Sequence, residues 1–368
     1  MILINKFLRN LKPYKLASHK IWSVSSNERS KILKLDWNEA TILPSPKVAE
    51  RIKNIVEKGN IYNYYPSTQN EELLDKLAMY TGMSKENLQY FASSDSLHEY
   101  IAKMYITIGD PILILGPSYD NFRLTCEANG ASVNFFYFAD DFSFDPIAFE
   151  KQIQKLNPSL VYICNPNNPT GILHSINYIK HLLDEYPDTM FLVDEAYAEF
   201  TRVSVKELVV EYDNILISRT MSKAFAIANF RFGYLIASAR NVKEISKIRN
   251  PKNISTFAQE AAIGVLSDVP YMEAYVDEVL RAKKMFCEEL SRYDSLLTTF
   301  AQGGNFVLIK FNNVELKNKV QDHLTSRDIF VRSQTHHPSL LSCFRITIGT
   351  CEQMRRVLYE IAQVLNEA

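Results

Sequence analysis

A lysine among small hydroxyl side chains is the residue of this sequence with the most distinctive chemistry. Lys223 follows Thr220 and Ser222, between an apolar strand-like run at 214–217 and a segment with a helix-like pattern. A lysine amine is a good nucleophile near neutral pH only where desolvation or nearby cations lower its pKa. Its best use in such surroundings is a Schiff base with a carbonyl group. Arg231, eight residues further on, adds a permanent positive charge to the same stretch.

A carboxylate, Asp194, ends the apolar run at 190–194. A strand-end acid can hold a metal ion, as in nucleotide-triphosphate enzymes, but their Gly-x-x-x-x-Gly-Lys-Ser/Thr phosphate loop does not occur in this sequence. We therefore expect no metal site. Against a pyridine nitrogen, the same carboxylate would keep the nitrogen protonated, so that the ring could accept electrons from a carbanion. A purely structural carboxylate is the alternative, and the presence of Lys223 favours the chemical role.

A dense run of turn-forming residues, Asn-Pro-Asn-Asn-Pro-Thr-Gly at 165–171, follows the apolar run at 160–164. Such a run can be no more than a tight loop. At the carboxyl edge of a sheet, however, Asn168 would stand beside Asp194, where its amide could hydrogen-bond a ring hydroxyl. The phenol of Tyr197 would lie beside the same oxygen. Two such donors would tune the acidity of an adjacent Schiff base.

A polar cluster, Ser-Ser-Asp-Ser at 93–96, precedes the helix-like stretch 97–105. These residue types are typical N-caps, so a plain capped helix is one interpretation. The other is a phosphate cradle, because free backbone N–H groups and the dipole at a helix start favour a dianion. The cradle would use Ser94, Asp95, Thr220, Ser222 and Arg231. Together with the lysine, the strand-end carboxylate and the amide–phenol pair, it predicts a pyridoxal 5′-phosphate site.

The overall composition excludes several other classes of protein. The 368 residues carry 41 basic and 42 acidic side chains, a net charge of −1 without a basic stripe, so neither nucleic acid nor an anionic membrane surface is an expected partner. The five cysteines form no Cys-x-x-Cys pair, which favours reduced thiols. No apolar run approaches the roughly 20 residues that span a bilayer. We expect a cytoplasmic protein.

Apolar runs alternate with amphipathic segments through the middle of the chain, which predicts a mainly parallel, doubly wound α/β sheet. The runs lie at 111–115, 133–137, 160–164, 190–194 and 215–217. Ligands of such sheets collect outside the carboxyl ends of the strands. After 249–253 the pattern changes to α+β, with helical patterns at 271–291 and from 352. We expect an N-terminal segment (1–44) that joins a small C-terminal domain (266–368), and a large domain at 45–265.

The set of motifs resembles fold-type I pyridoxal-phosphate aminotransferases, and most closely the histidinol-phosphate aminotransferase group. The resemblance covers nearly the whole chain, and the motifs together are specific although each alone is weak. They lie at 35–39, 64–66, 116–119, 168–171, 194–197, 218–231 and 344–350.

The resemblance implies a role for several residues around the cofactor. Lys223 is similar to the Schiff-base lysine, which is also the base for the 1,3-proton transfer, and Asp194 to the partner of the pyridinium. Tyr119 resembles the aromatic residue that stacks on the cofactor ring. Tyr65 resembles a tyrosine that reaches the cofactor phosphate of a neighbouring subunit, which implies a homodimer with shared active sites.

The resemblance also implies substrate contacts. Arg345 is similar to the arginine that binds the anionic group of the substrate, and Arg332 matches a second arginine of this group. Tyr14 resembles a contact to the substrate phosphate, and Asn38 lies in the motif at 35–39. Histidinol phosphate has no carboxylate, so its phosphate takes the place of glutamate's α-carboxylate, and a guanidinium fork serves either anion. We expect a phosphorylated substrate, with glutamate as the amino donor. The alternative interpretation of Arg332 is a solvated surface charge.

Departures from the family pattern leave the substrate open. The chain has Ser-Ser-Asp-Ser at 93–96 where the family shows Gly-Ser/Ala-Asp-Glu, Ala-Asn-Phe-Arg at 228–231 for Ala-Gly-Leu-Arg, and Pro-Lys-Asn at 251–253 for Pro-Tyr-Asn. The segment 35–41 is similar to relatives in surface-polysaccharide (capsule) biosynthesis, some of which aminate very small phosphorylated ketones. Dihydroxyacetone phosphate, giving serinol phosphate, is therefore expected alongside imidazole acetol phosphate, giving histidinol phosphate.

Two other functions fit the scaffold less well. Related chains decarboxylate phosphoserine or phosphothreonine, and the sequence does not separate this reaction from transamination. A non-catalytic regulator on the same fold would carry an added DNA-binding domain, for which this chain has no spare length or basic helix.

Overall fold

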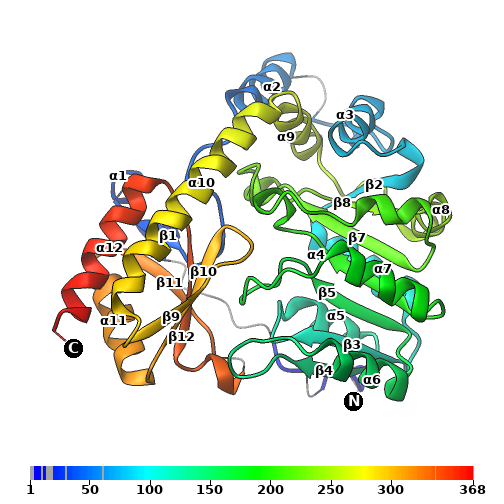
Figure 1. Cartoon of the computed structure of the whole chain (residues 1–368). Coiled ribbons are helices and arrows are strands. Elements are labelled where there is room, and N and C mark those ends of the chain that lie inside the picture. The colour runs from blue at the N-terminus through cyan, green and yellow to red at the C-terminus, as the bar shows by residue number, and fades with distance from the viewer. Residues whose placement is uncertain are drawn as a thin grey trace.

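The computed structural model describes residues 4–9, 11–13, 20–29, 31–59, 62–335 and 337–367. Their strands form two sheets, seen in the right and left halves of Figure 1. The larger sheet has the order β2-β8-β7-β6-β5-β3-β4. Its strands are β2 (Leu88–Phe91), β3 (Pro111–Gly116), β4 (Ser132–Tyr137), β5 (Leu160–Cys164), β6 (Met190–Asp194), β7 (Ile215–Thr220) and β8 (Gly233–Ala237).

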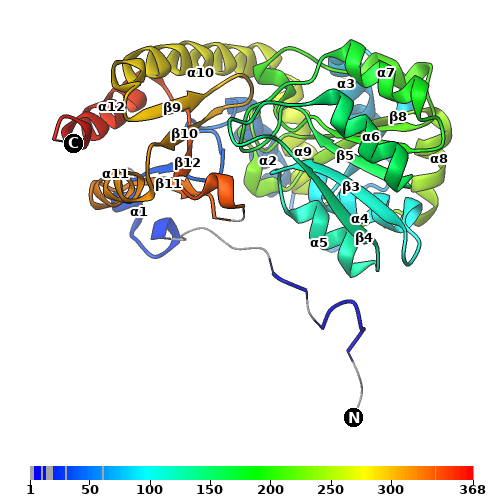
Figure 2. The same cartoon turned by 60° about the horizontal axis from the view of Figure 1, so that its bottom comes forward.

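The larger sheet is mainly parallel and covered on both faces. Strands β4, β3, β5, β6 and β7 pair in parallel, whereas β8 is antiparallel to β7 and β2. The inner strands β3, β5 and β6 are almost continuous apolar runs because both of their faces are buried, whereas the edge strand β4 is only partly buried. Figure 2 shows α6 (Pro146–Leu156) and α7 (Ile176–Glu185) on one side, and α4 (Ser94–Tyr105) and α5 (Asn121–Ala128) on the other. The predicted doubly wound α/β fold is confirmed.

The smaller sheet joins the two ends of the chain. Its order is β1-β11-β12-β10-β9, and Leu33 of β1 pairs in parallel with Ile329 of β11. The helices α11 (Val314–Ser326) and α12 (Cys351–Leu365) pack beside it, and the long α10 (Val269–Leu290) contacts α12. The boundaries at 44/45 and 265/266 remain predictions. The strands are β1 (Leu33–Leu35), β9 (Leu297–Phe300), β10 (Phe306–Phe311), β11 (Ile329–Ser333) and β12 (Cys343–Thr347).

Local capping explains where the helices begin and end. Helix α3 (Glu71–Thr81) starts after Asn70, whose side chain accepts a hydrogen bond from the N–H of Leu73, and it stops at Gly82 in the left-handed region (φ 72°). Thr350 and Gln353 form a capping box at the start of α12. The remaining helices are α1 (Ser26–Arg29), α2 (Pro46–Lys58), α8 (Ala239–Ile248) and α9 (Thr256–Leu266).

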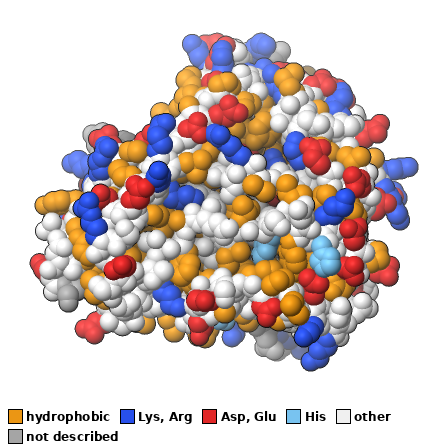
Figure 3. Space-filling model, in the orientation of Figure 1, with side chains coloured by type: hydrophobic (Ala, Val, Ile, Leu, Met, Phe, Trp, Pro, Cys, Tyr) orange, Lys and Arg blue, Asp and Glu red, His pale blue; other side chains and the backbone are white. Residues whose placement is uncertain are grey.

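The helix expected directly after Lys223 is wrong. The chain there makes turns, with Ala226 in the left-handed region (φ 59°), and then one turn of 3₁₀ helix, η5 (Ala228–Phe230). These turns bring Arg231 back toward the strand edge, whereas a continuous helix would carry this residue away from it. Among the described residues, no helix is both long and apolar enough to cross a bilayer. Charges of both signs are interspersed on the face in Figure 3.

Candidate active site

The ends of three parallel strands bring the predicted residues together. Cys164 of β5 pairs with Asp194 of β6, which pairs in turn with Ser218 of β7. The loops after these strands begin at one edge of the sheet, and they carry Asn168, Tyr197 and Lys223. This is the edge at which open α/β sheets bind ligands.

Asp194 is a buried, anchored carboxylate. Its Oδ2 accepts a hydrogen bond from the phenol of Tyr162 at 2.8 Å, and its Oδ1 accepts one from the N–H of Ala196 at 3.1 Å. Burial and the neighbouring carboxylate raise the pKa of Tyr162, so this phenol keeps its proton and remains a donor. Beneath the strand, Ser218 Oγ lies 2.9 Å from Nε2 of the buried His98. The carboxylate therefore has a fixed orientation.

The amine of Lys223 is prepared as a nucleophile. Burial lowers its pKa to about 8, the charge of Arg345 acts in the same direction, and the carboxylates of Glu39 and Asp95 oppose it. The amine donates a hydrogen bond to the carbonyl of Trp37 at 2.9 Å. A substantial fraction of this lysine is therefore neutral near pH 8, as the attack on an aldehyde requires.

A second group of side chains surrounds the phenol of Tyr197. The phenol oxygen accepts hydrogen bonds from the side-chain amides of Asn168 (3.2 Å) and Asn38 (3.0 Å). The amide oxygen of Asn168 accepts one from Arg345 Nη1 at 2.6 Å. Burial raises the pKa of Tyr197, so the phenol stays protonated. With both bonds arriving at its oxygen, its own proton can be donated to a further oxygen, which fits a ring hydroxyl of pyridoxal phosphate.

The start of α4 lies against β8. A side chain at Gly233 would come within 2.4 Å of the N–H nitrogen of Ser94, so only glycine allows this close approach. Asp95, the next residue, accepts hydrogen bonds from the phenol of Tyr119 (3.2 Å) and from Arg231 Nη2 (3.1 Å). On the other side of Gly233, Thr220 pairs with it in the sheet and lies 2.9 Å from the hydroxyl of Ser222. The five residues of the predicted cradle thus converge on one helix N-terminus, a geometry that fits a phosphate.

Two arginines of the smaller sheet face each other. Arg332 of β11 and Arg345 of β12 are directly opposite in the antiparallel register, so their side chains leave the same face of the sheet. Like charges in this position are destabilising. Arg345 is also buried, and its Nη2 donates to the carbonyl of Asp36 at 2.5 Å. An anion bound between the two guanidinium groups would offset their repulsion.

Tyr65 lies on the surface: it is 80% exposed, and the ammonium of Lys252 lies 4.7 Å from the centroid of its ring. Tyr14 lies outside the described residues.

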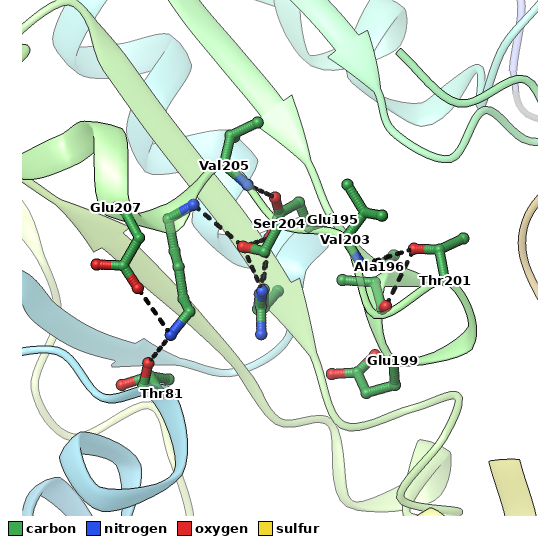
Figure 4. A network of polar contacts seen from close by, with 12 residues as sticks. Thr81, Glu195, Ala196, Glu199, Thr201, Val203, Ser204, Val205 and Glu207 are labelled. Carbon is green, nitrogen blue, oxygen red and sulfur yellow. Dashed lines mark hydrogen bonds and ion pairs between the residues drawn. The ribbon is translucent and has the colours of Figure 1, made fainter. Parts of the chain in front are cut away.

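A buried ion pair supports the strand ends from behind. Arg219 Nη2 lies 2.7 Å from Glu195 Oε2, and the two side chains are 7% and 1% exposed. Both also hydrogen-bond the hydroxyl of Ser204. Figure 4 shows Glu195 and Ser204 pointing toward each other beside Val205, whose N–H binds the second carboxylate oxygen. Because removing one partner would leave a buried charge uncompensated, this pair fixes the residue next to Asp194.

Several contacts of the site were not anticipated from the sequence. Tyr162 lies inside an apolar run and has no local feature that distinguishes it from a core tyrosine. The carbonyls of Asp36 and Trp37 bind Arg345 and Lys223, but a backbone acceptor has no sequence signature. Only the density of polar residues within the motif at 35–39 marks this segment.

Comparison with known proteins shows the family to which this sequence is similar. The sequence model of the family described as aminotransferase class I and II matches residues 30–361. The chain is 43% identical over 366 residues to a dihydroxyacetone phosphate transaminase of Campylobacter jejuni, covering 98% of this chain and 96% of that one. It is 32% identical over 361 residues to a histidinol-phosphate aminotransferase of Ruminiclostridium cellulolyticum, with 98% and 97% covered.

A solved structure supports the fold. The histidinol-phosphate aminotransferase of Sinorhizobium meliloti, in complex with pyridoxal 5′-phosphate, superimposes with a TM-score of 0.87 at 23% identity, covering 99% of this chain and 98% of that one. At this identity the likeness bears on the fold alone.

Proposed function

The chain belongs to the aminotransferase class I and II family, and from this premise we propose that it moves an amino group from an amino acid to a small phosphorylated ketone. It is a pyridoxal-phosphate-dependent transaminase. Glutamate is the proposed donor. Dihydroxyacetone phosphate is the proposed acceptor, giving serinol phosphate. The relative with 43% identity is named for that substrate, whereas the histidinol-phosphate aminotransferases of Ruminiclostridium cellulolyticum and Carboxydothermus hydrogenoformans are 32% and 33% identical.

The observation that carries this proposal is the facing pair Arg332 and Arg345. The pair is joined through Asn168 to the phenol of Tyr197, and the charge of Arg345 acts on Lys223, so an anion held there would lie close to the amine. A single guanidinium suffices for a carboxylate, whereas two suit a phosphate dianion. The same site can therefore accept both the α-carboxylate of an amino donor and the phosphate of a ketone.

Bound pyridoxal phosphate would supply an aldehyde and an electron-accepting ring. We assign Lys223 as the amine that binds the aldehyde and then moves the proton between substrate carbon and cofactor. With the cofactor bound, Asp194 would hold a proton on the ring nitrogen, and Tyr119 would cover the ring. The phenol of Tyr197 and the amide of Asn168 would orient the ring hydroxyl. Ser94, Asp95, Thr220, Ser222 and Arg231 would hold the phosphate, with Asp95 orienting the guanidinium of Arg231.

The proposal is tested with the wild-type holoenzyme. On addition of glutamate alone, the visible absorption band of the cofactor is expected to move to the near ultraviolet. Dihydroxyacetone phosphate should restore the visible band faster than imidazole acetol phosphate, at equal concentration in stopped flow. No shift with any amino acid would refute the transaminase. Release of carbon dioxide from phosphoserine or phosphothreonine, without need of a 2-oxo acid, would point to the decarboxylase.

A homodimer with shared active sites is the second part of the proposal. Large apolar side chains are exposed between residues 43 and 65, and a run of this kind on a surface suits a protein–protein contact. Tyr65, 80% exposed, would reach the cofactor phosphate of the other subunit. The exposed residues are Leu43, Val56, Tyr62, Tyr64 and Tyr65. We also place the reaction in the cytoplasm, in keeping with five free cysteines.

Sharing of active sites predicts a specific complementation. Dimers that combine one Lys223→Ala subunit with one Tyr65→Ala subunit should contain one intact site, because Lys223 of one chain meets Tyr65 of the other. Differently tagged chains, co-expressed and purified through both tags, should show about half the wild-type kcat. If the sites are not shared, the mixed dimer has only the activity of its Tyr65→Ala subunit, at most half that of the pure variant.

A further inference from the structure

One short segment presents three successive polar groups to the proposed catalytic residues. The segment is 36–38, and the carbonyl of Asp36, its first residue, accepts a hydrogen bond from Arg345 Nη2 at 2.5 Å. The carbonyl of its second residue accepts one from Lys223 Nζ at 2.9 Å. The side-chain amide of the third, Asn38, donates to the phenol oxygen of Tyr197 at 3.0 Å. The path of this backbone therefore sets the positions of the anion-binding, nucleophilic and phenolic groups together.

The backbone of the segment is fixed from two sides at Asn38. Asn38 has φ 55°, in the left-handed region, which asparagine adopts more readily than most other residues. Its N–H donates to Thr347 Oγ1 at 3.0 Å, and its carbonyl accepts from the side chain of Asn305 at 3.1 Å. Both partners belong to the smaller sheet and the loop before β10, so they hold the segment against that sheet.

Lys34 connects Asp36, the first residue of this segment, with Glu39, the residue that follows it. Its ammonium donates to Asp36 Oδ1 at 2.9 Å and to the carboxylate of Glu39, and it lies 4.3 Å from the ring centroid of Trp37. The side chains of Lys34, Asp36 and Glu39 are 13%, 3% and 32% exposed. A lysine with two carboxylates and an aromatic face has little freedom to move, and neither carboxylate has another cation within ion-pair distance among the described residues.

We propose that Lys34 is a positioning residue, whose ammonium, held between Asp36 and Glu39, fixes the segment 36–38 against Lys223 and Arg345. Without this cation the two carboxylates would repel each other, and the buried one would draw water or move outward. Both movements displace the carbonyls that hold the amine and the guanidinium. The inference rests on the role of Lys223 in the proposed function.

The electrostatic surroundings of Lys223 give this role a readout of its own. The charged groups that act on its amine are Arg345 and Arg231, which lower its pKa, and Glu39 and Asp95, which raise it. Lys34 neutralises Glu39, so its loss leaves that carboxylate free to raise the pKa of Lys223. Replacing Glu39 by glutamine has the opposite effect, because one of the two opposing carboxylates disappears.

The experiment measures capture of pyridoxal 5′-phosphate by apoprotein as a function of pH, next to turnover by the holoenzyme. Only the neutral amine reacts, so the capture rate rises with pH through the pKa of the lysine. We expect Lys34→Met to move this midpoint upward and Glu39→Gln to move it downward. We also expect Lys34→Met to lower kcat by roughly 10- to 100-fold, the effect of a misplacement of about 1 Å, and Lys34→Arg to restore most of it.

Controls separate this outcome from loss of folding and from failure of the proposed function. Lys47→Met removes an exposed lysine that pairs with Glu50 on α2, and it should change neither readout. Circular dichroism identifies any variant that does not fold. If Lys34→Met does not fold, Glu39→Gln supplies the test, because the side chain of Glu39 is partly exposed. Unchanged midpoint and kcat in folded Lys34→Met would overturn the inference. Failure of the wild-type apoprotein to capture the cofactor would instead overturn the proposed function.

Discussion

Replacing Lys223 with alanine is expected to lower kcat by on the order of 10⁴- to 10⁶-fold, the size found when a nucleophile is removed from an enzyme. The structure gives the reason, because this amine donates to the carbonyl of Trp37 at 2.9 Å, lies 6.0 Å from the ring centroid of Tyr197, and has its pKa lowered by burial and by the charge of Arg345. The variant should bind pyridoxal phosphate without a covalent bond and lose it on gel filtration, whereas the wild type retains it after borohydride reduction. Mass spectrometry of the reduced protein checks the site of attachment directly.

The matched control is a second buried lysine. Lys283, on α10, is 7% exposed, and burial lowers its pKa to about 8 as well. Its ammonium donates to the carbonyl of Gly304 at 2.9 Å, whereas that of Lys223 donates to the carbonyl of Trp37. A lowered pKa alone therefore does not distinguish the two lysines, and only the surroundings do. Lys283→Met should keep the covalent cofactor, and a borohydride adduct on Lys283 instead of Lys223 would contradict the assignment.

The convergence at the edge of the large sheet could be predicted from the sequence because its cause is general. Carboxyl ends of parallel strands meet at one edge, so residues that follow apolar runs at 160–164, 190–194 and 215–217 must be neighbours. The proximity of Asp194, Asn168 and Lys223 could be predicted once these three runs were identified as parallel strands. The helix expected after Lys223 was wrong because tertiary contacts override a short amphipathic pattern: the turns there let Met221 N–H bond the carbonyl of Phe232.

The contribution of the N-terminal segment could not be predicted in this way. The hydrogen bond between Lys223 and the carbonyl of Trp37 joins residues 186 positions apart, and its acceptor is a backbone atom that every residue possesses. The pairing of Arg332 with Arg345 depends on the register of β11 and β12, which a shift of one residue would abolish. The family resemblance singled out both arginines, but their opposition is a property of the fold.

Replacing Arg345 with methionine is expected to lower kcat/KM by about 10³-fold for both glutamate and the phosphorylated ketone. A charge-assisted, two-pronged contact to an anion contributes about 4 kcal/mol, and each 1.4 kcal/mol is a factor of ten. Loss of this positive charge should also raise the pKa of the free Lys223 amine, so capture of pyridoxal 5′-phosphate by the apoprotein should require a higher pH. Steady-state kinetics measures the first effect, and the rate of cofactor capture between pH 6 and 10 measures the second.

The second arginine makes the test specific for phosphate. Arg332→Met should weaken kcat/KM for the ketone by more than for glutamate, because a dianion uses the second guanidinium and a carboxylate does not. Arg345→Lys keeps the charge but loses the planar fork, so its kcat/KM should fall between those of wild type and Arg345→Met, and the pH dependence of its cofactor capture should stay close to wild type. Arg292→Met, which removes an arginine whose side chain is 71% exposed, is the control and should match the wild type. Equal losses for both substrates in Arg332→Met would mean that the pair does not select for phosphate, and that the preference for a phosphorylated ketone arises elsewhere in the site.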